Sequence, residues 1–258
     1  NDPRNQLLIK YFEFVRQIRP KFFLVENVPG LIWSRNKDYL QAFYSIATES
    51  GYKVLNPEIL NAMNFGIPQS RKRVFILGIR GDLNIDTLFW PPKPTYGNGL
   101  KELVPSSIAF TETWDGDPND IHSVHTEEII SAFKNTPING GSRMESGRQL
   151  KCHIGHKGHS DVYGRIDPSK PAPTMTAGCT SPSKGRFVHP TEPHGITLRQ
   201  AARLQTFPDD FIFYGGMTSS TRQIGNAVPV LMAESVLRPI YDILVSIDLE
   251  KLKMEDAA

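Results

Sequence analysis

Lys21 to Val28 reads KFFLVENV, and this short run is the most informative one in the chain. Aromatic and β-branched side chains form an apolar segment that ends in the polar pair Glu26-Asn27, and Pro29-Gly30 then predicts a turn. Such a segment is typical of a strand that is buried on both faces, as in a parallel sheet. Its polar end lies where open α/β sheets place their ligands. Taken alone, the pair is equally well explained as a hydrogen-bonded strand end.

On both sides of this strand the sequence alternates between helical and extended patterns. Apolar residues recur at helical spacing from Leu7 to Ile18, and a second helix is predicted from about Asp38 to Ser50. Tyr52 to Leu60 is then predicted to be extended, and RVFILGIR at 73–80 to be another buried strand. This alternation predicts an α/β fold with a doubly wound sheet.

The composition changes at about Trp90. Residues 91–220 are rich in Pro, Gly, Ser, Thr and His and show no long helical period, which predicts a smaller, loop-rich domain of irregular, mixed β strands. Short helical periodicity returns from Ile196 to Leu204, and a longer helix is predicted from Val228 to Ile247 with Asn226 as its N-cap. We therefore expect one domain at 1–90 and 222–258, and a second at 91–221.

The overall composition is that of an ordinary globular protein, with 258 residues of which 39% are hydrophobic and 22% charged. No apolar run is long enough for a membrane span, and the N-terminus does not resemble a signal peptide. The formal net charge of +2 says little about nucleic acid, so local clusters must decide that question. The chain opens at Asn1 on a segment that is predicted to be structured, which suggests a fragment, a processed product or one half of a split protein.

Two further segments carry candidate chemistry. In GIPQSRKR at 66–73, Arg71 and Arg73 alternate and could point to one face, where guanidinium groups suit phosphate oxygens and base carbonyls. A solvated charge run is the commoner explanation of such a cluster. In QIGNAVP at 223–229, backbone N–H groups at the start of the last helix could bind a carboxylate or phosphate, or could simply cap the helix.

Taken together and in order, these segments resemble the cytosine-5 DNA methyltransferase family over nearly the whole chain. Asp2 to Leu7 resembles the block after the family's catalytic loop, and the other matching blocks are Glu26 to Val28 (ENV), Gln69 to Arg73 (QxRxR), Thr197 to Phe211 and Gln223 to Val228. Many members have Glu at the position of Gln200, so a structural contact there is in question. The family's glycine-rich cofactor block and its Pro-Cys nucleophile loop have no counterpart in this sequence.

The resemblance implies a fold and a reaction. The fold would be the C-terminal part of a Rossmann-like methyltransferase sheet plus a target-recognition domain. The reaction would transfer a methyl group from S-adenosylmethionine to C5 of a cytosine that is flipped out of a specific duplex DNA sequence. Glu26, kept protonated by a dry pocket, would contact N3 and Arg73 would contact O2, while Asn27 orients the site and Arg71 binds the nearby backbone.

The resemblance also assigns binding residues. Leu7 would pack near the adenine of the cofactor, and Asn226 and Ala227 would lie near its amino-acid end, with most of that site upstream of Asn1. The recognition domain would read the major groove of double-stranded DNA. The candidate DNA-binding residues are Arg4, Gln69, Arg143, Arg148, Lys151, Arg165 and Lys184. Most of these charges could serve only to position the DNA backbone.

Neither cysteine is expected to be the nucleophile, because Cys152 and Cys179 both lack the Pro-Cys context. Two cysteines also argue against a disulfide scaffold and for a reducing compartment. The cluster of Cys152, His153, His156 and His159 has the ligand types of a zinc site but no second pair of ligands, so we expect no metal.

Three functional hypotheses remain open. In the first, the chain is part of a bacterial, cytoplasmic restriction-modification enzyme. It is inactive alone until a missing segment or second chain supplies the nucleophile, and its sheet has an exposed edge. In the second, it is a non-catalytic DNA-recognition subunit. The third, methylation of tRNA, ranks low because the recognition segment is long.

Overall fold

The computed structural model describes residues 6–83, 85, 88–147 and 161–255. The chain divides into two compact units. We call residues 1–61, 72–93 and 235–258 the sheet unit, and residues 62–71 and 94–234 the loop unit. Compared with the predicted domains, segments 62–71 and 222–234 fall in the loop unit rather than with the sheet. Within the described residues, no helix has the length and apolar character needed to cross a membrane.

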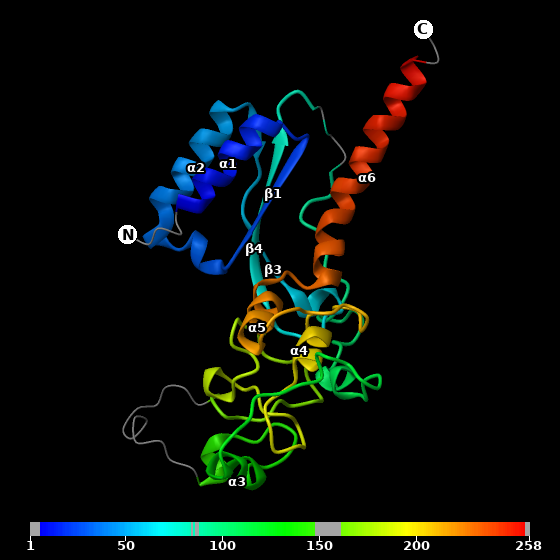
Figure 1. Ribbon diagram of the computed structural model, residues 1–258. Helices are drawn as coiled ribbons and strands as arrows, with labels where there is room; N and C mark the ends of the chain where they lie inside the picture. The colour runs from blue at the N-terminus through cyan, green and yellow to red at the C-terminus, as the bar shows by residue number, and fades with distance from the viewer. Residues whose placement is uncertain (1–5, 84, 86–87, 148–160, 256–258) are drawn as a thin grey trace. The chain divides into compact units, whose positions relative to one another are not determined.

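The sheet unit consists of helices α1 (Gln6–Ile18) and α2 (Lys37–Glu49), short turns η2 (Pro29–Ile32) and η3 (Ser34–Asn36), and four strands. The strands are β1 (Phe22–Asn27), β2 (Tyr52–Val54), β3 (Glu58–Asn61) and β4 (Lys72–Arg80). The long strand β4 has β1 along one edge and β2 and β3 along the other (Figure 1). Helix α6 (Val230–Glu255) begins in the loop unit and belongs to the sheet unit from Ser235 onward.

The α/β class is confirmed, but the parallel strand direction that the sequence predicted is wrong. β1 and β4 are neighbours and antiparallel, with Phe23 opposite Gly78 and Glu26 opposite Phe75. The β2–β4 and β3–β4 pairs are antiparallel too. A continuous apolar run indicates that a strand is buried on both faces. The direction of that strand relative to its neighbour depends on the chain connections, which the run does not show.

Aromatic rings form the core of the sheet unit. Phe12 of α1, Phe23 of β1, Phe43 of α2 and Tyr52 of β2 meet in edge-to-face contacts with ring centroids 5.2–6.0 Å apart. The ring of Phe23 lies over Gly78, where an added Cβ would come within 2.0 Å of it. A glycine at this point of β4 therefore makes room for the aromatic core.

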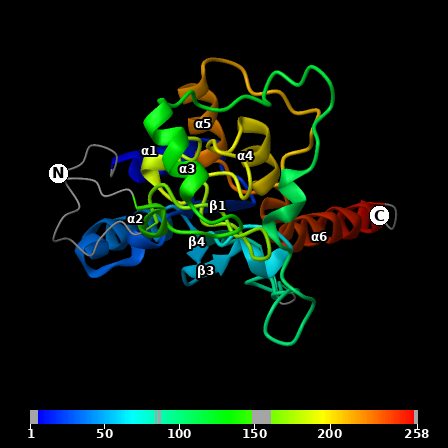
Figure 2. The same ribbon diagram turned by 90° about the horizontal axis from the view of Figure 1, so that it is seen from below.

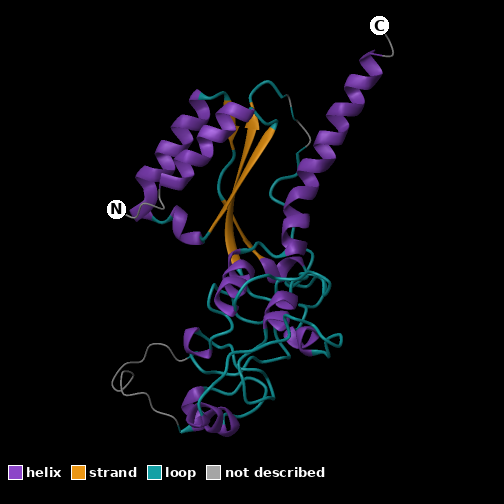
Figure 3. Ribbon diagram, viewed as in Figure 1, coloured by secondary structure: helices purple, strands orange, loops and turns teal. Residues whose placement is uncertain are grey.

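The loop unit contains short helices and irregular backbone. Its elements are η4 (Ala62–Phe65), η5 (Ser106–Phe110), α3 (Glu127–Asn135), η6 (Arg143–Ser146), η8 (Pro182–Lys184), α4 (Leu198–Leu204) and α5 (Met217–Asn226). In place of the expected irregular strands, its described residues form isolated β-bridges such as Arg165–Val188 (Figure 3). Helices α3 and α5 were not expected.

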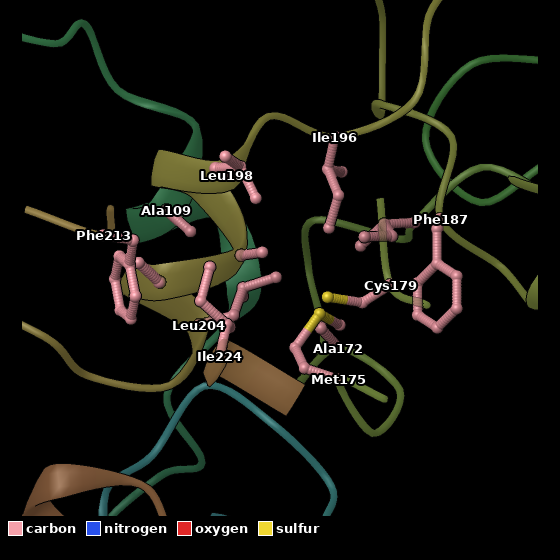
Figure 4. Close-up of a cluster of buried hydrophobic side chains, with 13 residues drawn as sticks. Ala109, Ala172, Met175, Cys179, Phe187, Ile196, Leu198, Leu204, Phe213 and Ile224 are labelled. Atoms are coloured by element: carbon pink, nitrogen blue, oxygen red, sulfur yellow. The ribbon is translucent and has the colours of Figure 1, made fainter. Parts of the chain in front are cut away.

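Two neighbouring helices, α4 and α5, organise the loop unit (Figure 2). Between them and the segment 172–187 lies an apolar core in which the side chains of Met175 and Cys179 come together (Figure 4). Helix α4 begins with a capping box, in which the Thr197 side chain accepts from Gln200 N and Gln200 Oε1 accepts from Thr197 N. The contact that the Gln200 departure had put in question is therefore made.

The segment 223–229 differs from the prediction. Gln223 to Asn226 form the last turn of α5, so Asn226 ends one helix and is not the N-cap of the next. Gly225 packs against backbone, because a Cβ there would lie 2.2 Å from the carbonyl of Thr176. This stretch offers carbonyl oxygens rather than the free N–H groups that would bind an anion.

Candidate active site

Glu26 and Arg73 meet at one end of the sheet. Glu26 is the fifth residue of β1 and lies opposite Phe75, so Arg73, two residues earlier on β4, is its diagonal neighbour on the same face. Arg73 Nε lies 2.9 Å from Glu26 Oε1, and the side chains are 13% and 27% exposed, respectively. The pairing register thus brings together the carboxylate and one guanidinium that the sequence had singled out.

The electrostatics of this pair have two opposing parts. Burial lowers the pKa of Arg73, and the nearby Glu26 carboxylate partly offsets that shift. A guanidinium at this distance also stabilises the charged form of a carboxyl group. The structure thus places a cation beside Glu26, and the expectation that a dry pocket protonates this residue stays a prediction. Asn27 Oδ1 accepts from the backbone N–H of Val28 at 2.8 Å and fixes the turn after the strand.

Arg71 does not share this face, which corrects the prediction for it. It precedes β4, belongs to the loop unit and is only 1% exposed. Its guanidinium donates to the carbonyls of Met175 at 2.7 Å, and of Gly225 and Ala227 at 2.9 Å. These hydrogen bonds connect the residue before β4 to the end of α5. The guanidinium of Arg71 is therefore not exposed to bind a phosphate.

Gln69 is also structural rather than a surface group for DNA. Its side chain is fully buried, and it donates to Leu204 O and Gln205 Oε1 at 2.9 Å while accepting from Met175 N. Gln205 continues the network to Ile224 O. Together with Arg71, these amides hold segment 62–71 inside the loop unit, which explains why the domain boundary differs from the predicted one.

The candidate recognition residues fall into three groups. Arg165 is 1% exposed and donates to four carbonyls, those of Phe133, Thr136, His189 and Glu192, so its burial does not support the prediction that it binds DNA. Arg143 is also buried, at 3% exposure, whereas Lys184 is exposed. Arg4, Arg148 and Lys151 lie outside the described residues, as do Cys152, His153, His156 and His159 of the zinc hypothesis.

Lys184 lines a surface cavity of about 740 Å³ within the loop unit. Two other cations at this cavity are already used: Lys170 pairs with Asp167, and Arg186 donates to Asp161 and to the carbonyls of Gly140 and Arg165. No ion pair among the described residues involves Lys184. Sequence reasoning missed Arg186, whose surroundings carry no motif that marks it.

The cofactor candidates are only partly suited to that role. Leu7 is 62% exposed on α1, and Asn226 is exposed at the end of α5. The Ala227 carbonyl is occupied by Arg71 and Gln205. Leu7 lies in the sheet unit, whereas Asn226 and Ala227 lie in the loop unit, and neither set suffices by itself to hold S-adenosylmethionine.

Cys179 lies in the apolar core of the loop unit, and burial raises the pKa of its thiol to about 12. A thiol in this state stays protonated and unreactive at neutral pH. In the described part of the chain, no three His, Cys, Asp or Glu side chains gather as metal ligands.

Comparisons with known proteins identify the family of the chain. The family model for C-5 cytosine-specific DNA methylases matches residues 1–242. The Type II methyltransferase M.NgoFVII of Neisseria gonorrhoeae is 33% identical over 262 residues, covering 98% of this chain and 68% of that protein. M.XorII of Xanthomonas oryzae is 29% identical over 269 residues, covering 92% of this chain and 62% of that protein.

Among solved structures, a prophage-encoded DNA modification methyltransferase of E. coli matches with a TM-score of 0.72 at 23% identity, covering 95% of this chain and 75% of that one. The chain thus spans about two thirds of the length of these curated relatives. Since the matched range contains Glu26 and Arg73 and nearly all of both units, the chain belongs to the C-5 cytosine-specific DNA methylase family.

Proposed function

We propose that this chain takes part in methylating C5 of a cytosine flipped out of a specific duplex DNA sequence, as part of a restriction-modification system. The observation that carries the proposal is the Glu26–Arg73 pair at 2.9 Å, on the strand end that the family model includes. Methyltransferases of this family generally use S-adenosylmethionine as the methyl donor.

The two side chains suit one edge of a cytosine ring. O2 accepts hydrogen bonds, as the guanidinium of Arg73 requires, and the adjacent N3 can share a proton with Glu26. When a nucleophile adds to C6, negative charge grows on both atoms, and these two contacts stabilise it. Arg73 turning from Glu26 to O2 would leave the carboxyl group without its cation in a partly desolvated site, which favours the protonated form that N3 needs.

We further propose that a complementing segment, on the same polypeptide or on a second chain, supplies the nucleophile and the glycine-rich cofactor loop. Two observations support this part of the proposal. The outer edge of β1 has no strand partner among the described residues. In addition, α1 exposes Leu7, Phe14 and Ile18, at 62%, 62% and 72%. The chain alone is therefore expected to show no methyl transfer.

The test is Glu26→Gln in the assembled enzyme. The rate of labelled-methyl transfer to duplex DNA should fall by roughly 10²–10⁴-fold while DNA binding survives. Glu49→Gln, the same change on the exposed end of α2, serves as the matched control and should leave the rate unchanged. Near-normal turnover of Glu26→Gln would refute the role of this residue.

The runner-up is a non-catalytic DNA-recognition subunit. It predicts sequence-specific DNA binding, but no methyl transfer with any complementing segment that carries the cofactor loop and a Pro-Cys pair. Running the same transfer assay on tRNA and on duplex DNA separates the third hypothesis, since label on tRNA alone would reassign the substrate.

A further inference from the structure

The turn that follows Glu26-Asn27 is a closed, internally hydrogen-bonded loop. Between Val28 and Asn36 it makes two successive 3-10 turns, η2 and η3, and Trp33 stands between them. The backbone bonds Leu31 N to Val28 O and Trp33 N to Gly30 O hold η2, and Asn36 Nδ2 closes the loop by donating to Gly30 O at 2.6 Å. Leu31 anchors the loop in the aromatic core, and η2 packs against β4.

This loop presents a stacked pair of side chains to solvent. Trp33 is 55% exposed, and the guanidinium carbon of Arg35 lies 4.8 Å from its ring centroid, a cation–π arrangement. No hydrogen bond or ion pair from the Arg35 side chain occurs in the described part of the chain. The pair thus keeps an open aromatic surface and unused guanidinium N–H groups on a backbone that is already ordered.

These two groups match the two chemical parts of a nucleotide. An aromatic ring stacks on any unpaired base, and a guanidinium edge donates to phosphate oxygens. The loop continues β1 directly, so it starts at the strand end that carries Glu26 (Figure 1). Extruding one cytosine leaves a base without its pairing partner and neighbours without their stacking contacts.

We propose that Trp33 and Arg35 form a stacking platform for a nucleotide that is exposed when the target cytosine leaves the duplex. Trp33 receives the base and Arg35 its phosphate, so both are positioning residues. This inference rests on the proposed function and extends it, because it assigns to the loop after Glu26 the task of holding the DNA open.

The test compares the affinity of the full chain for two short duplexes, one with a central unpaired guanine, the base that loses its partner when a cytosine is extruded, and one fully paired. The wild-type chain should prefer the first duplex. Trp33→Ala should weaken binding to it by about 5- to 100-fold, the range for loss of one base–aromatic stack. Binding to the paired duplex should change by less than about twofold. Trp33→Phe should restore most of the preference, since an aromatic face remains.

Two controls separate the platform from a general effect. Phe89→Ala removes an aromatic side chain that is 79% exposed elsewhere in the sheet unit, and it should leave both affinities unchanged. With Trp90 and Trp114 both replaced by Phe, the remaining tryptophan fluorescence reports on Trp33 and should be quenched more by the unpaired-guanine duplex than by the paired one. Equal affinity of the wild-type chain for both duplexes, or equal quenching, overturns the platform. Neither result bears on Glu26, whose role is decided by the transfer assay.

Discussion

Arginine serves two opposite purposes in this protein. Arg71, Arg165 and Arg199 are among the largest fully buried side chains, and each donates to backbone carbonyls or to a carboxylate. Arg73, two positions from Arg71, keeps part of its surface and pairs with a carboxylate at a strand end. A planar fork of five donors suits either task, and only the acceptors around it decide which one it performs.

The ion pair of Arg199 allows the contribution of a buried arginine to stability to be measured. It pairs with Asp117 at 2.6 and 3.0 Å, and both side chains are fully buried. Burial alone would raise the pKa of Asp117, but hydrogen bonds from Arg199 and Asn119 outweigh it and lower that pKa. Asp117→Ala should lower the free energy of unfolding by about 3–5 kcal/mol in urea titration, because it leaves a buried cation uncompensated.

The matched control for this change is the ion pair of Arg203, which lies on the same helix as Arg199. Arg203 pairs with Asp209, which is 47% exposed, so Asp209→Ala should cost at most about 1 kcal/mol. Adding Arg199→Met to Asp117→Ala should recover part of the loss, since no unpaired charge then stays buried. Equal costs for the two aspartate variants would contradict this explanation.

His189 should make the stability of the loop unit depend on pH. Burial lowers its pKa to about 4, with His194 and Arg165 contributing, and its Nδ1 already accepts from the N–H groups of Thr191 and Glu192. The unfolded chain takes up this proton near pH 6.5 and the folded chain only near pH 4. Stability is therefore complete above about pH 6.5 and decreases, by roughly 2–3 kcal/mol, as the pH falls to about 4.

Urea unfolding at several pH values in this window measures the effect. His189→Asn keeps an oxygen acceptor but cannot titrate, so its stability should fall less steeply between pH 6.5 and 4. Some slope should remain, because burial also lowers the pKa values of His125 and His194. If the free energy of unfolding of the variant depended on pH as steeply as that of the wild type, His189 would not be the source of the pH dependence.

At the scale of residues, the sequence predicted the types of side chain at the site better than their surroundings. Glu26 and Arg73 could be paired from two buried strands with polar ends, and the antiparallel register makes that contact. Gln69 and Arg71 belong to the same motif, yet they bind carbonyls of residues more than a hundred positions away. No local pattern records such acceptors, so a motif identifies a polar residue without showing whether its side chain faces solvent or core.

At the scale of elements, apolar runs located β1 and β4 because burial dictates composition. Helix α5 was not predicted because it lacks such an apolar run. Its sequence, MTSSTRQIGN, is mostly small and polar, and its stability comes from packing a small-residue face rather than from a broad apolar stripe. The buried positions on that face are Ser220, Thr221, Ile224 and Gly225.

Gly225 is the position where this packing can be tested. Because a Cβ would lie 2.2 Å from backbone atoms of Thr176, Gly225→Ala must push α5 away from segment 176–177. We expect a loss of about 3 kcal/mol or more in urea unfolding. Gly216, at the N-cap of the same helix, has no atom within 4 Å of an added Cβ, so Gly216→Ala should cost at most about 1 kcal/mol. Similar values for the two variants would contradict the close contact.

At the scale of the whole molecule, the order of the motifs was sufficient to predict the family. Composition was not sufficient to predict how the chain divides into units. The segment 62–71 connects two paired strands of the sheet unit, yet buried amides and Arg71 hold it in the loop unit. Domain boundaries follow where buried hydrogen bonds are made, and composition alone does not show them.

The same scale makes a prediction about association. β1 has an open edge in the described structure, and Leu7, Phe14 and Ile18 recur on one face of α1 at helical spacing. Purified alone, the chain should self-associate through this surface, and sedimentation velocity should show species larger than a monomer. Phe14→Glu combined with Ile18→Lys should shift the chain toward the monomer, because two charges then oppose burial of the face. Phe89→Glu changes another exposed aromatic side chain and should not shift the chain toward the monomer.

A segment that carries the cofactor loop and nucleophile should compete with self-association, protect the amides of β1 from hydrogen exchange and restore methyl transfer together. If such a segment restored methyl transfer while β1 stayed unprotected, the completing contact would have to lie elsewhere on the chain.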